Sequence, residues 1–190
     1  MGRAFNFAKN VIKEKGLNMN KEYIYKLSGI INQFHESYIG QHCNGPTLHG
    51  YYLTENAPST FKELVEYRHC NVLPVYSGGS DATIYEHAYQ NYNFRFVHDL
   101  HHIKLNKDFS FEGELATIKS QYMKLLRWSF SVDYTRQERM DLLKLFLIDT
   151  TGQIDYYYKN KKYVGDQLSF ALDGMSKPVH DLLMITGCQL

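Results

Sequence analysis

Apolar residues recur every three or four positions along much of this chain, which is the spacing that places side chains on one face of an α-helix. Leu27, Ile30, Ile31 and Phe34 form such a face, and Asn20 can cap the helix that carries it. By the same criterion we expect core helices at about residues 20–38, 80–105, 111–130 and 136–149. A chain of 190 residues can bury these faces together, so residues 1–190 are expected to form a single domain of mainly α class.

Shorter signals predict a little β structure within this helical domain. Residues 153–165 carry several tyrosines around the basic run KNKK, a composition that favours a small β-hairpin. Residues 72–76 are predicted to form a short extended segment, which ends at the glycine-rich turn 77–81. After Asp166 the chain should form two short helices, with the break near Gly174 and Pro178. Two residue pairs have the spacing of helix capping boxes, namely Thr60 with Glu63 and Thr135 with Glu138.

Composition and charge argue against several function classes. The formal net charge is +1 and the one basic run is short, which disfavours a nucleic-acid-binding protein. No apolar run is long enough to cross a membrane, and the three cysteines are too widely spaced for a disulfide framework, so we expect a protein of the reducing cytoplasm. Sixteen tyrosines offer amphipathic surface for a substrate, a partner protein or a second copy of the chain in a homo-oligomer.

Three of the nine histidines lie in the segment HDLHH at 98–102. His98 and His102 are four residues apart, so on a helix their imidazoles lie one turn apart on the same face and can converge on one ion. The same spacing underlies the HExxH motif of zinc enzymes, in which a glutamate beside the first histidine acts as general base. Asp99 occupies that position here and is one methylene shorter. The segment therefore predicts two ligands of a divalent metal ion, with zinc as the first candidate.

A third ligand is expected from the segment FSFEGE, since a catalytic zinc ion usually has three protein ligands. If the turn before this segment sends the next helix back antiparallel, Glu114 comes to lie near the C-terminal half of the first helix. Glu112 and Asp108 are competing candidates, and His101 could replace His102 or supply a further ligand. Gly113 is a poor helix former, which predicts a close backbone approach or a delayed helix start.

Asp99 and Arg95 complete the predicted site. Asp99 would orient a ligand or act as base on a metal-bound water, directly or through a relay. Arg95 lies about one turn before His98 and would hold Asp99, Glu114 or the anion of a substrate. The alternative interpretation is a structural polar network that braces two helices without a metal. The tetrapeptide VHDL recurs at 179–182, but no histidine follows four residues later, so we expect only the start of a terminal helix there.

The run R-x-x-H-D-x-x-H, followed by Phe and then by Gly-Glu, resembles a motif of proteins encoded by bacteriophages and prophages. The matching positions are Phe94, Arg95, His98, Asp99, His102, Phe109 or Phe111, Gly113, Glu114 and Ala116. The resemblance carries no activity with it. It implies an origin in a mobile element, a location in the cytoplasm of a bacterial host and a host protein as a candidate partner.

The same region also resembles HD-domain phosphohydrolases, which need a histidine, then an adjacent His-Asp pair, then a distant aspartate. These places could be filled by His69, by His98 with Asp99, and by Asp141 or Asp149. The resemblance implies a phosphorylated substrate such as a nucleotide, which Arg95 and Lys104 would suit. It leaves His102 and Glu114 without a necessary role.

These observations predict a helical metalloprotein and, as the best single function, a metal-dependent hydrolase. His98, His102 and Glu114 would bind the metal, with Asp99 and Arg95 as catalytic side chains. One alternative is an HD-type nucleotide phosphohydrolase. The other is a non-enzymatic binding or inhibitor protein, encoded by a phage, whose polar cluster is structural.

Overall fold

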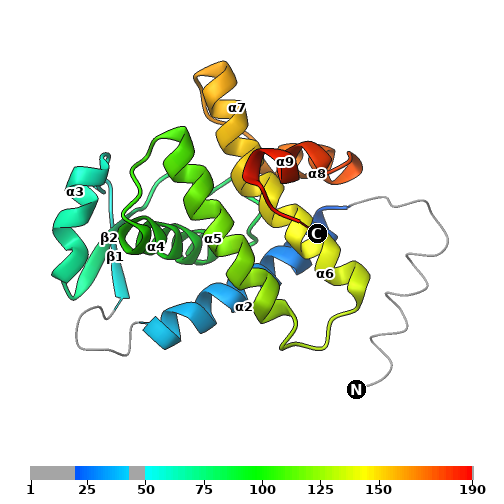
Figure 1. Cartoon of the computed structure of the whole chain (residues 1–190), viewed down its shortest axis with the longest axis horizontal. Coiled ribbons are helices and arrows are strands. Elements are labelled where there is room, and N and C mark those ends of the chain that lie inside the picture. Colours follow the sequence, from blue (N-terminus) through cyan, green and yellow to red (C-terminus); the bar gives the residue numbers. More distant parts are fainter. Residues whose placement is uncertain (1–19, 43–49, 190) are drawn as a thin grey trace.

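Four long helices form the centre of the structure, a computed structural model that describes residues 20–42 and 50–189. They are α2 (Lys21–His42), α4 (Ala88–Leu105), α5 (Phe111–Ser129) and α6 (Arg136–Leu147). In Figure 1, α4 lies beside α5, α2 runs below them and α6 follows α5. α2 contacts both α4 and α6, and α5 contacts the same two helices. The expectation of a mainly α fold with short strands is confirmed.

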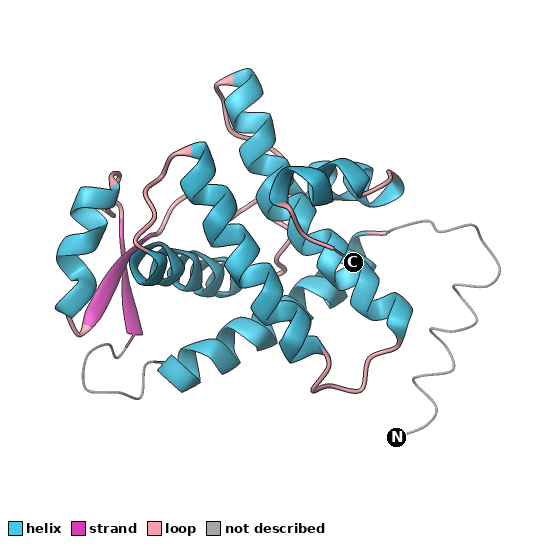
Figure 2. Cartoon of the chain, viewed as in Figure 1, coloured by secondary structure: helices cyan, strands magenta, loops and turns pink. Residues whose placement is uncertain are grey.

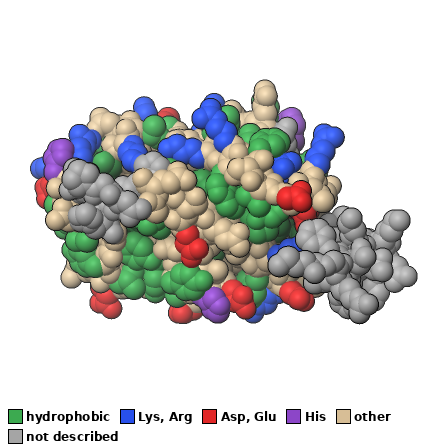
Figure 3. All heavy atoms as spheres, turned by 90° about the horizontal axis from the view of Figure 1, so that it is seen from below, with side chains coloured by type: hydrophobic (Ala, Val, Ile, Leu, Met, Phe, Trp, Pro, Cys, Tyr) green, Lys and Arg blue, Asp and Glu red, His purple; other side chains and the backbone are tan. Residues whose placement is uncertain are grey.

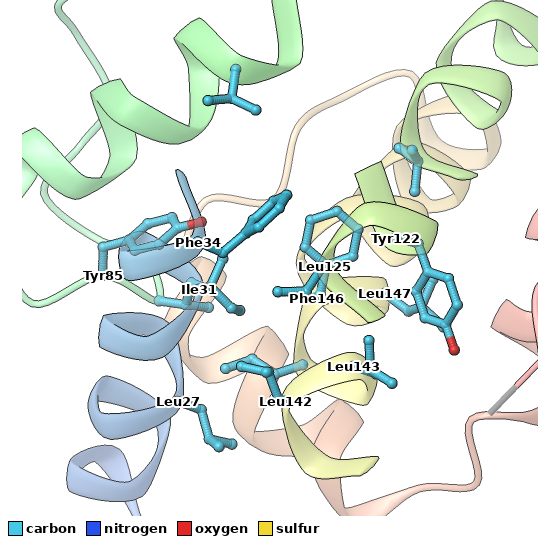
Figure 4. Packing of buried hydrophobic residues seen from close by; sticks show 14 of the residues in the cluster. Leu27, Ile31, Phe34, Tyr85, Tyr122, Leu125, Leu142, Leu143, Phe146 and Leu147 are labelled. Atoms are coloured by element: carbon cyan, nitrogen blue, oxygen red, sulfur yellow. The ribbon is translucent and has the colours of Figure 1, made fainter. Parts of the chain in front are cut away.

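Buried apolar side chains from these helices fill the space between them. Figure 4 shows the side chains of α2 pointing toward α6 and α5. The labelled core residues of these helices are Leu27, Ile31 and Phe34 on α2, Tyr122 and Leu125 on α5, and Leu142, Leu143, Phe146 and Leu147 on α6. Burying one such side chain contributes roughly 1.5–3 kcal/mol. This core therefore fixes α5, and with it α4, in the positions on which the site described below depends.

A two-stranded parallel sheet lies at one end of the helices (Figure 2). β1 (Gly50–Thr54) pairs with β2 (Val72–Tyr76) over all five residues of each strand. Parallel neighbours need a crossover connection, which α3 (Phe61–Glu66) and the 3-10 turn η1 (Tyr67–His69) supply. β2 is the extended segment predicted at 72–76, whereas β1 was not expected.

The predicted helix at 80–105 is wrong in its first turns, because α4 begins only at Ala88. Thr83, Ile84 and Tyr85 precede it in a segment of turns and bends, and all three are buried. A helix through this segment would pair the Ala82 carbonyl oxygen with a later N–H of the same helix. That oxygen instead accepts from Gln167 N–H at 2.9 Å, so a tertiary contact replaces the helical bond there.

The predicted β-hairpin at 153–165 is also wrong. The chain continues from α6 through a π-helical turn, η2 (Ile148–Gly152), into α7 (Gln153–Asn160), and so remains helical. Tyrosine favours strands only where a neighbouring strand offers a surface to pack on. Here Tyr158 packs against Phe111 of α5 instead, with ring centroids 5.0 Å apart.

The C-terminal part and the helix caps follow the prediction. α8 (Gln167–Ser176) and α9 (His180–Thr186) are the two expected helical pieces, and the break between them contains Pro178, whereas Gly174 lies within α8. His180 and Asp181, from the repeated VHDL, are exposed at the start of α9, as expected for a simple helix start. Both predicted capping boxes form, at the starts of α3 and α6.

The surface carries charges of both signs. Figure 3 shows a face on which acidic and basic side chains lie among exposed hydrophobic ones. Across residues 20–42 and 50–189, no helix combines the length and the apolar character needed to cross a membrane. Tyr52, Tyr76, Tyr89 and Tyr163 are exposed. A partner or a second copy of the chain at these tyrosines stays a prediction.

Candidate metal centre

The turn between α4 and α5 brings the site together. α4 ends at Leu105 and is capped by Asn106, whose φ of 52° is left-handed. Ser110 caps α5, with its side-chain oxygen accepting from Gly113 N–H. Gly113 lies against the backbone of Asp108, and a Cβ at this position would overlap the Asp108 carbonyl oxygen. The close backbone approach predicted for Gly113 is confirmed. It places Glu114 beside the last turns of α4.

We expect Gly113→Ala to lower the free energy of unfolding by at least about 2 kcal/mol, because the added methyl group meets backbone rather than a movable side chain. Thermal unfolding measures this loss. Gly29→Ala is the matched control, since this residue also lies within a helix but its added Cβ would meet nothing within 4 Å beyond its chain neighbours and the adjacent backbone of its own helix. That variant should gain roughly 0.5–1 kcal/mol. Equal melting temperatures for the two variants would contradict the close approach.

Among the described residues, His98, His102 and Glu114 form the one group of three side chains that could hold a metal ion. His98 Nε2 lies 3.0 Å from His102 Nε2 and 3.0 Å from Glu114 Oε2, and His102 Nε2 lies 3.5 Å from the same oxygen. Ligand atoms bound at ~2.0–2.1 Å around a tetrahedral zinc ion stand about 3.3 Å apart. The three predicted ligands thus have separations close to those of three corners of a zinc tetrahedron.

Each imidazole is held through its other nitrogen. His98 Nδ1 donates to Gln121 Oε1 at 3.0 Å, and His102 Nδ1 donates to the Lys107 carbonyl oxygen at 2.9 Å. Both oxygens can only accept, so both Nδ1 atoms carry hydrogen and both Nε2 atoms face Glu114. Histidine ligands of metal ions almost always have such an outer partner, which fixes the tautomer and the ring orientation.

A shared proton joins the three atoms when no metal is bound. Burial lowers the pKa of His98, but the hydrogen bond and charge of Glu114, together with the charge of Asp99, outweigh burial and raise this pKa to about 9. Burial raises the pKa of Glu114, but the neighbouring imidazoles of His102 and His98 outweigh burial and lower this pKa to about 2. Near neutral pH, His98 Nε2–H therefore donates to an ionised Glu114. The cluster is an ion pair whose proton a metal cation can replace.

Asp99 lies beside the three ligands rather than among them. Neither Nδ1 atom uses it, so the orienting contacts predicted for Asp99 belong to Gln121 and Lys107 instead. Burial raises the pKa of Asp99 to about 6, although the charges of His98 and His102 lower it. A carboxyl group with a pKa near neutrality can both take up and release a proton, which a general base requires.

Arg95 bonds to a backbone turn, not to the site carboxylates as predicted. Its guanidinium donates to the carbonyl oxygens of Tyr76 and Gly78, both at 2.6 Å, and of Gly79 at 3.3 Å. The chain leaves β2 at these residues, and the fork of donors on one guanidinium satisfies all three oxygens. Arg95 therefore fastens the end of β2 to α4, and these contacts do not support the catalytic role predicted for it.

The competing ligand candidates lie outside the group. Asp108 Oδ1 accepts from the hydroxyl of Ser110 at 2.5 Å, and Glu112 is exposed. His101 is buried, and its Nδ1 donates to the Val97 carbonyl oxygen at 2.7 Å. Of the residues that the sequence left open as a third ligand, Glu114 is the one that joins the two histidines.

The described residues do not assemble the side chains that an HD-type site would need. His69 is exposed in the turn after α3. Asp141 accepts from Tyr23 Oη at 2.8 Å, and Asp149 accepts from Gln153 Nε2 at 2.7 Å. None of the three belongs to a group with the His-Asp pair of α4.

A groove of about 530 Å³ opens beside the first turn of α5. It is lined by Ser110, Phe111, Glu112, Asp155, Tyr158 and Lys159. Tyr158 Oη donates to the Phe109 carbonyl oxygen at 3.2 Å, and the Phe109 ring meets the His102 ring edge-on, with centroids 4.9 Å apart. Phe109 therefore contacts Tyr158 of the groove wall through its carbonyl oxygen and the candidate ligand His102 through its ring.

Sequence reasoning missed the outer partners of the two imidazoles. Thr117 and Gln121 follow Glu114 by three and seven residues, so all three lie on one face of α5. Thr117 Oγ1 lies 3.4 Å from His102 Nδ1. Polar residues at this spacing, inside an otherwise apolar stripe, are a signal that the sequence does carry. The Lys107 carbonyl has no such signal, because every residue offers a backbone oxygen.

No protein-family model, curated protein or solved structure matches this chain. The resemblances to phage-encoded proteins and to HD-domain phosphohydrolases therefore stay predictions. The function has to be inferred from the ligand set, its outer partners and the groove beside it.

Proposed function

We propose that His98, His102 and Glu114 bind one divalent metal ion, with zinc the best match, and that the protein is a metal-dependent hydrolase. The observation that carries the proposal is the convergence of two Nε2 atoms and one carboxylate oxygen at 3.0 to 3.5 Å. Both Nδ1 atoms are already engaged by oxygen acceptors, which leaves the Nε2 lone pairs for a metal. Two histidines and one glutamate are a ligand set of catalytic zinc sites, which keep an open position.

The chemistry that this ligand set supports is hydrolysis of an ester, amide or phosphoester bond. A zinc ion held by three protein ligands accepts a water and lowers the pKa of that water toward 7. We assign the general base to Asp99, the partly buried carboxyl group next to His98 on α4. We assign substrate binding to the groove lined by residues of α5 and α7, whose Tyr158 contacts Phe109, which in turn packs on His102.

Metal analysis of the purified protein tests the proposal. We expect about one zinc ion per chain, a lower melting temperature after chelation, and recovery when zinc is added back. Hydrolysis of a panel of p-nitrophenyl carboxylic and phosphate esters and peptide anilides should disappear and return with the metal. No bound metal, with a melting temperature that chelation leaves unchanged, would rule out the metal site. Bound metal without hydrolysis of any panel member would leave the site and contradict the hydrolase.

The second candidate is a non-enzymatic binding or inhibitor protein. It is favoured by the His98–Glu114 ion pair, which closes between α4 and α5 without needing a metal. In that case the wild type would bind no metal, and Glu114→Gln would only lower its melting temperature. A phage origin, as the sequence resemblance implies, would suit such a protein and would make a host protein its partner.

A further inference from the structure

We infer that Gln121 is a positioning residue for the metal centre, an inference that rests on the metal site proposed above. Gln121 has no exposed surface, and its Oε1 accepts from His98 Nδ1–H at 3.0 Å. Its side-chain amide nitrogen is also buried, and within the described residues it has no hydrogen-bond partner. A buried donor left in this way costs roughly 1–3 kcal/mol. The unpaired side-chain nitrogen of Gln121 therefore lowers the free energy of unfolding.

The surroundings of Gln121 show what packing alone would favour there. Ile118, Tyr122 and Leu125 lie on the same buried part of α5 and are fully buried. A leucine at position 121 has a similar size and a high helix propensity, and it would bring no unpaired amide into this core. The favourable contact that glutamine makes at this position and leucine could not make is the hydrogen bond from His98 Nδ1–H to Oε1.

That contact decides which nitrogen of His98 faces the other ligands. With Oε1 as acceptor, the hydrogen stays on Nδ1 and Nε2 points at His102 and Glu114. Without an acceptor, the ring could rotate about its Cβ–Cγ bond or change tautomer, and the Nε2 lone pair would no longer be held in place. Gln121 thus orients a ligand without touching the metal.

Two substitutions separate this role from a packing role. Gln121→Leu removes the acceptor, but it also removes the unpaired amide, so the melting temperature of the metal-free protein should change by only a few degrees. Its zinc affinity, measured by competition with a chromophoric chelator, should fall about 10- to 100-fold. Gln121→Glu keeps an acceptor at the same place and should hold zinc within about tenfold of the wild type. Gln137→Leu, an exposed position on α6, is the matched control and should bind as the wild type does.

The zinc affinities and the cobalt spectrum of these variants decide whether Gln121 positions His98. Unchanged zinc affinity in Gln121→Leu would overturn it. An equal loss of affinity in Gln121→Leu and Gln121→Glu would also overturn it, because an acceptor would then not be what matters. If the cobalt-substituted Gln121→Leu protein keeps the visible spectrum of the wild type at saturation, the ligand geometry does not depend on Gln121 and the inference fails. Absence of zinc binding by the wild type would instead refute the proposed metal site first.

Discussion

The His102→Ala protein should lose zinc binding, whereas His101→Ala should retain it. The two residues are neighbours on α4, and both side chains are fully buried. Only His102 presents an Nε2 atom to the other ligands, while His101 donates to a backbone carbonyl and stacks on Tyr38. We expect the affinity of His102→Ala for zinc to fall by more than the roughly 100-fold that losing an outer partner can cost.

The pair of variants controls for packing, because each loses one buried ring. Both should lose about 2–4 kcal/mol of unfolding free energy in the metal-free state. Denaturant unfolding in the presence of a chelator measures this loss, and isothermal titration with zinc measures binding. Equal zinc affinities for the two variants would exclude His102 as a ligand, whatever their stabilities.

Zinc affinity should fall about tenfold for each pH unit as the pH is lowered from about 9 to 6.5. The reason is that zinc and a proton compete for His98 Nε2, whose pKa is raised to about 9 in the metal-free protein by the hydrogen bond and charge of Glu114, against the effect of burial. Between pH 8 and pH 6.5 the predicted loss is therefore more than tenfold. Titration at several pH values, corrected for the chelator's own protonation, measures the slope. A zinc affinity that did not change over this range would contradict the shared proton.

The stability of the metal-free protein should change with pH in the opposite direction to its zinc affinity. A histidine whose folded pKa of about 9 exceeds its ordinary value of 6.5 contributes stability that is complete below pH 6.5 and is lost as the pH rises through 9. As the pH rises from 6.5 to 9, the chelated protein should therefore lose this contribution. Over the same range the zinc-bound protein binds its metal more tightly. The difference between the two melting temperatures should widen with pH. Taking the difference cancels remote groups such as Asp149, whose pKa burial raises to about 7.

Much of the helical frame could be read from local patterns. α2, α5 and α6 lie within a few residues of their predicted bounds, because apolar spacing and capping boxes depend on only a turn or two of chain. The ligand set followed from equally local facts. His98 and His102 are one turn apart, and a tight turn near Gly113 returns the chain so that Glu114 meets them.

The errors fall where the outcome depends on distant neighbours. The tyrosines of α7 were predicted as strands, but no strand lies beside them in the described structure. The preceding helix continues through η2, and an ion pair of 2.7 Å between Lys159 and Asp155 supports α7. Arg95 was expected to hold Asp99, Glu114 or the anion of a substrate. Its actual partners are carbonyl oxygens at the end of β2, which reach it only after the sheet has docked on α4.

Read from its residues alone, this protein is a mainly helical chain with two histidines and a glutamate placed to converge. A periodicity, a helix cap or a spacing of four residues needs only the geometry of one stretch of backbone, so the sequence carries it in full. Only the tertiary structure decided the partners of His98 and Arg95. The packing of α4 against α5 places Gln121 beside His98, and the docking of β2 on α4 brings three carbonyl oxygens to Arg95. Such partners depend on where two elements come to rest against each other, and that is set by the buried core as a whole.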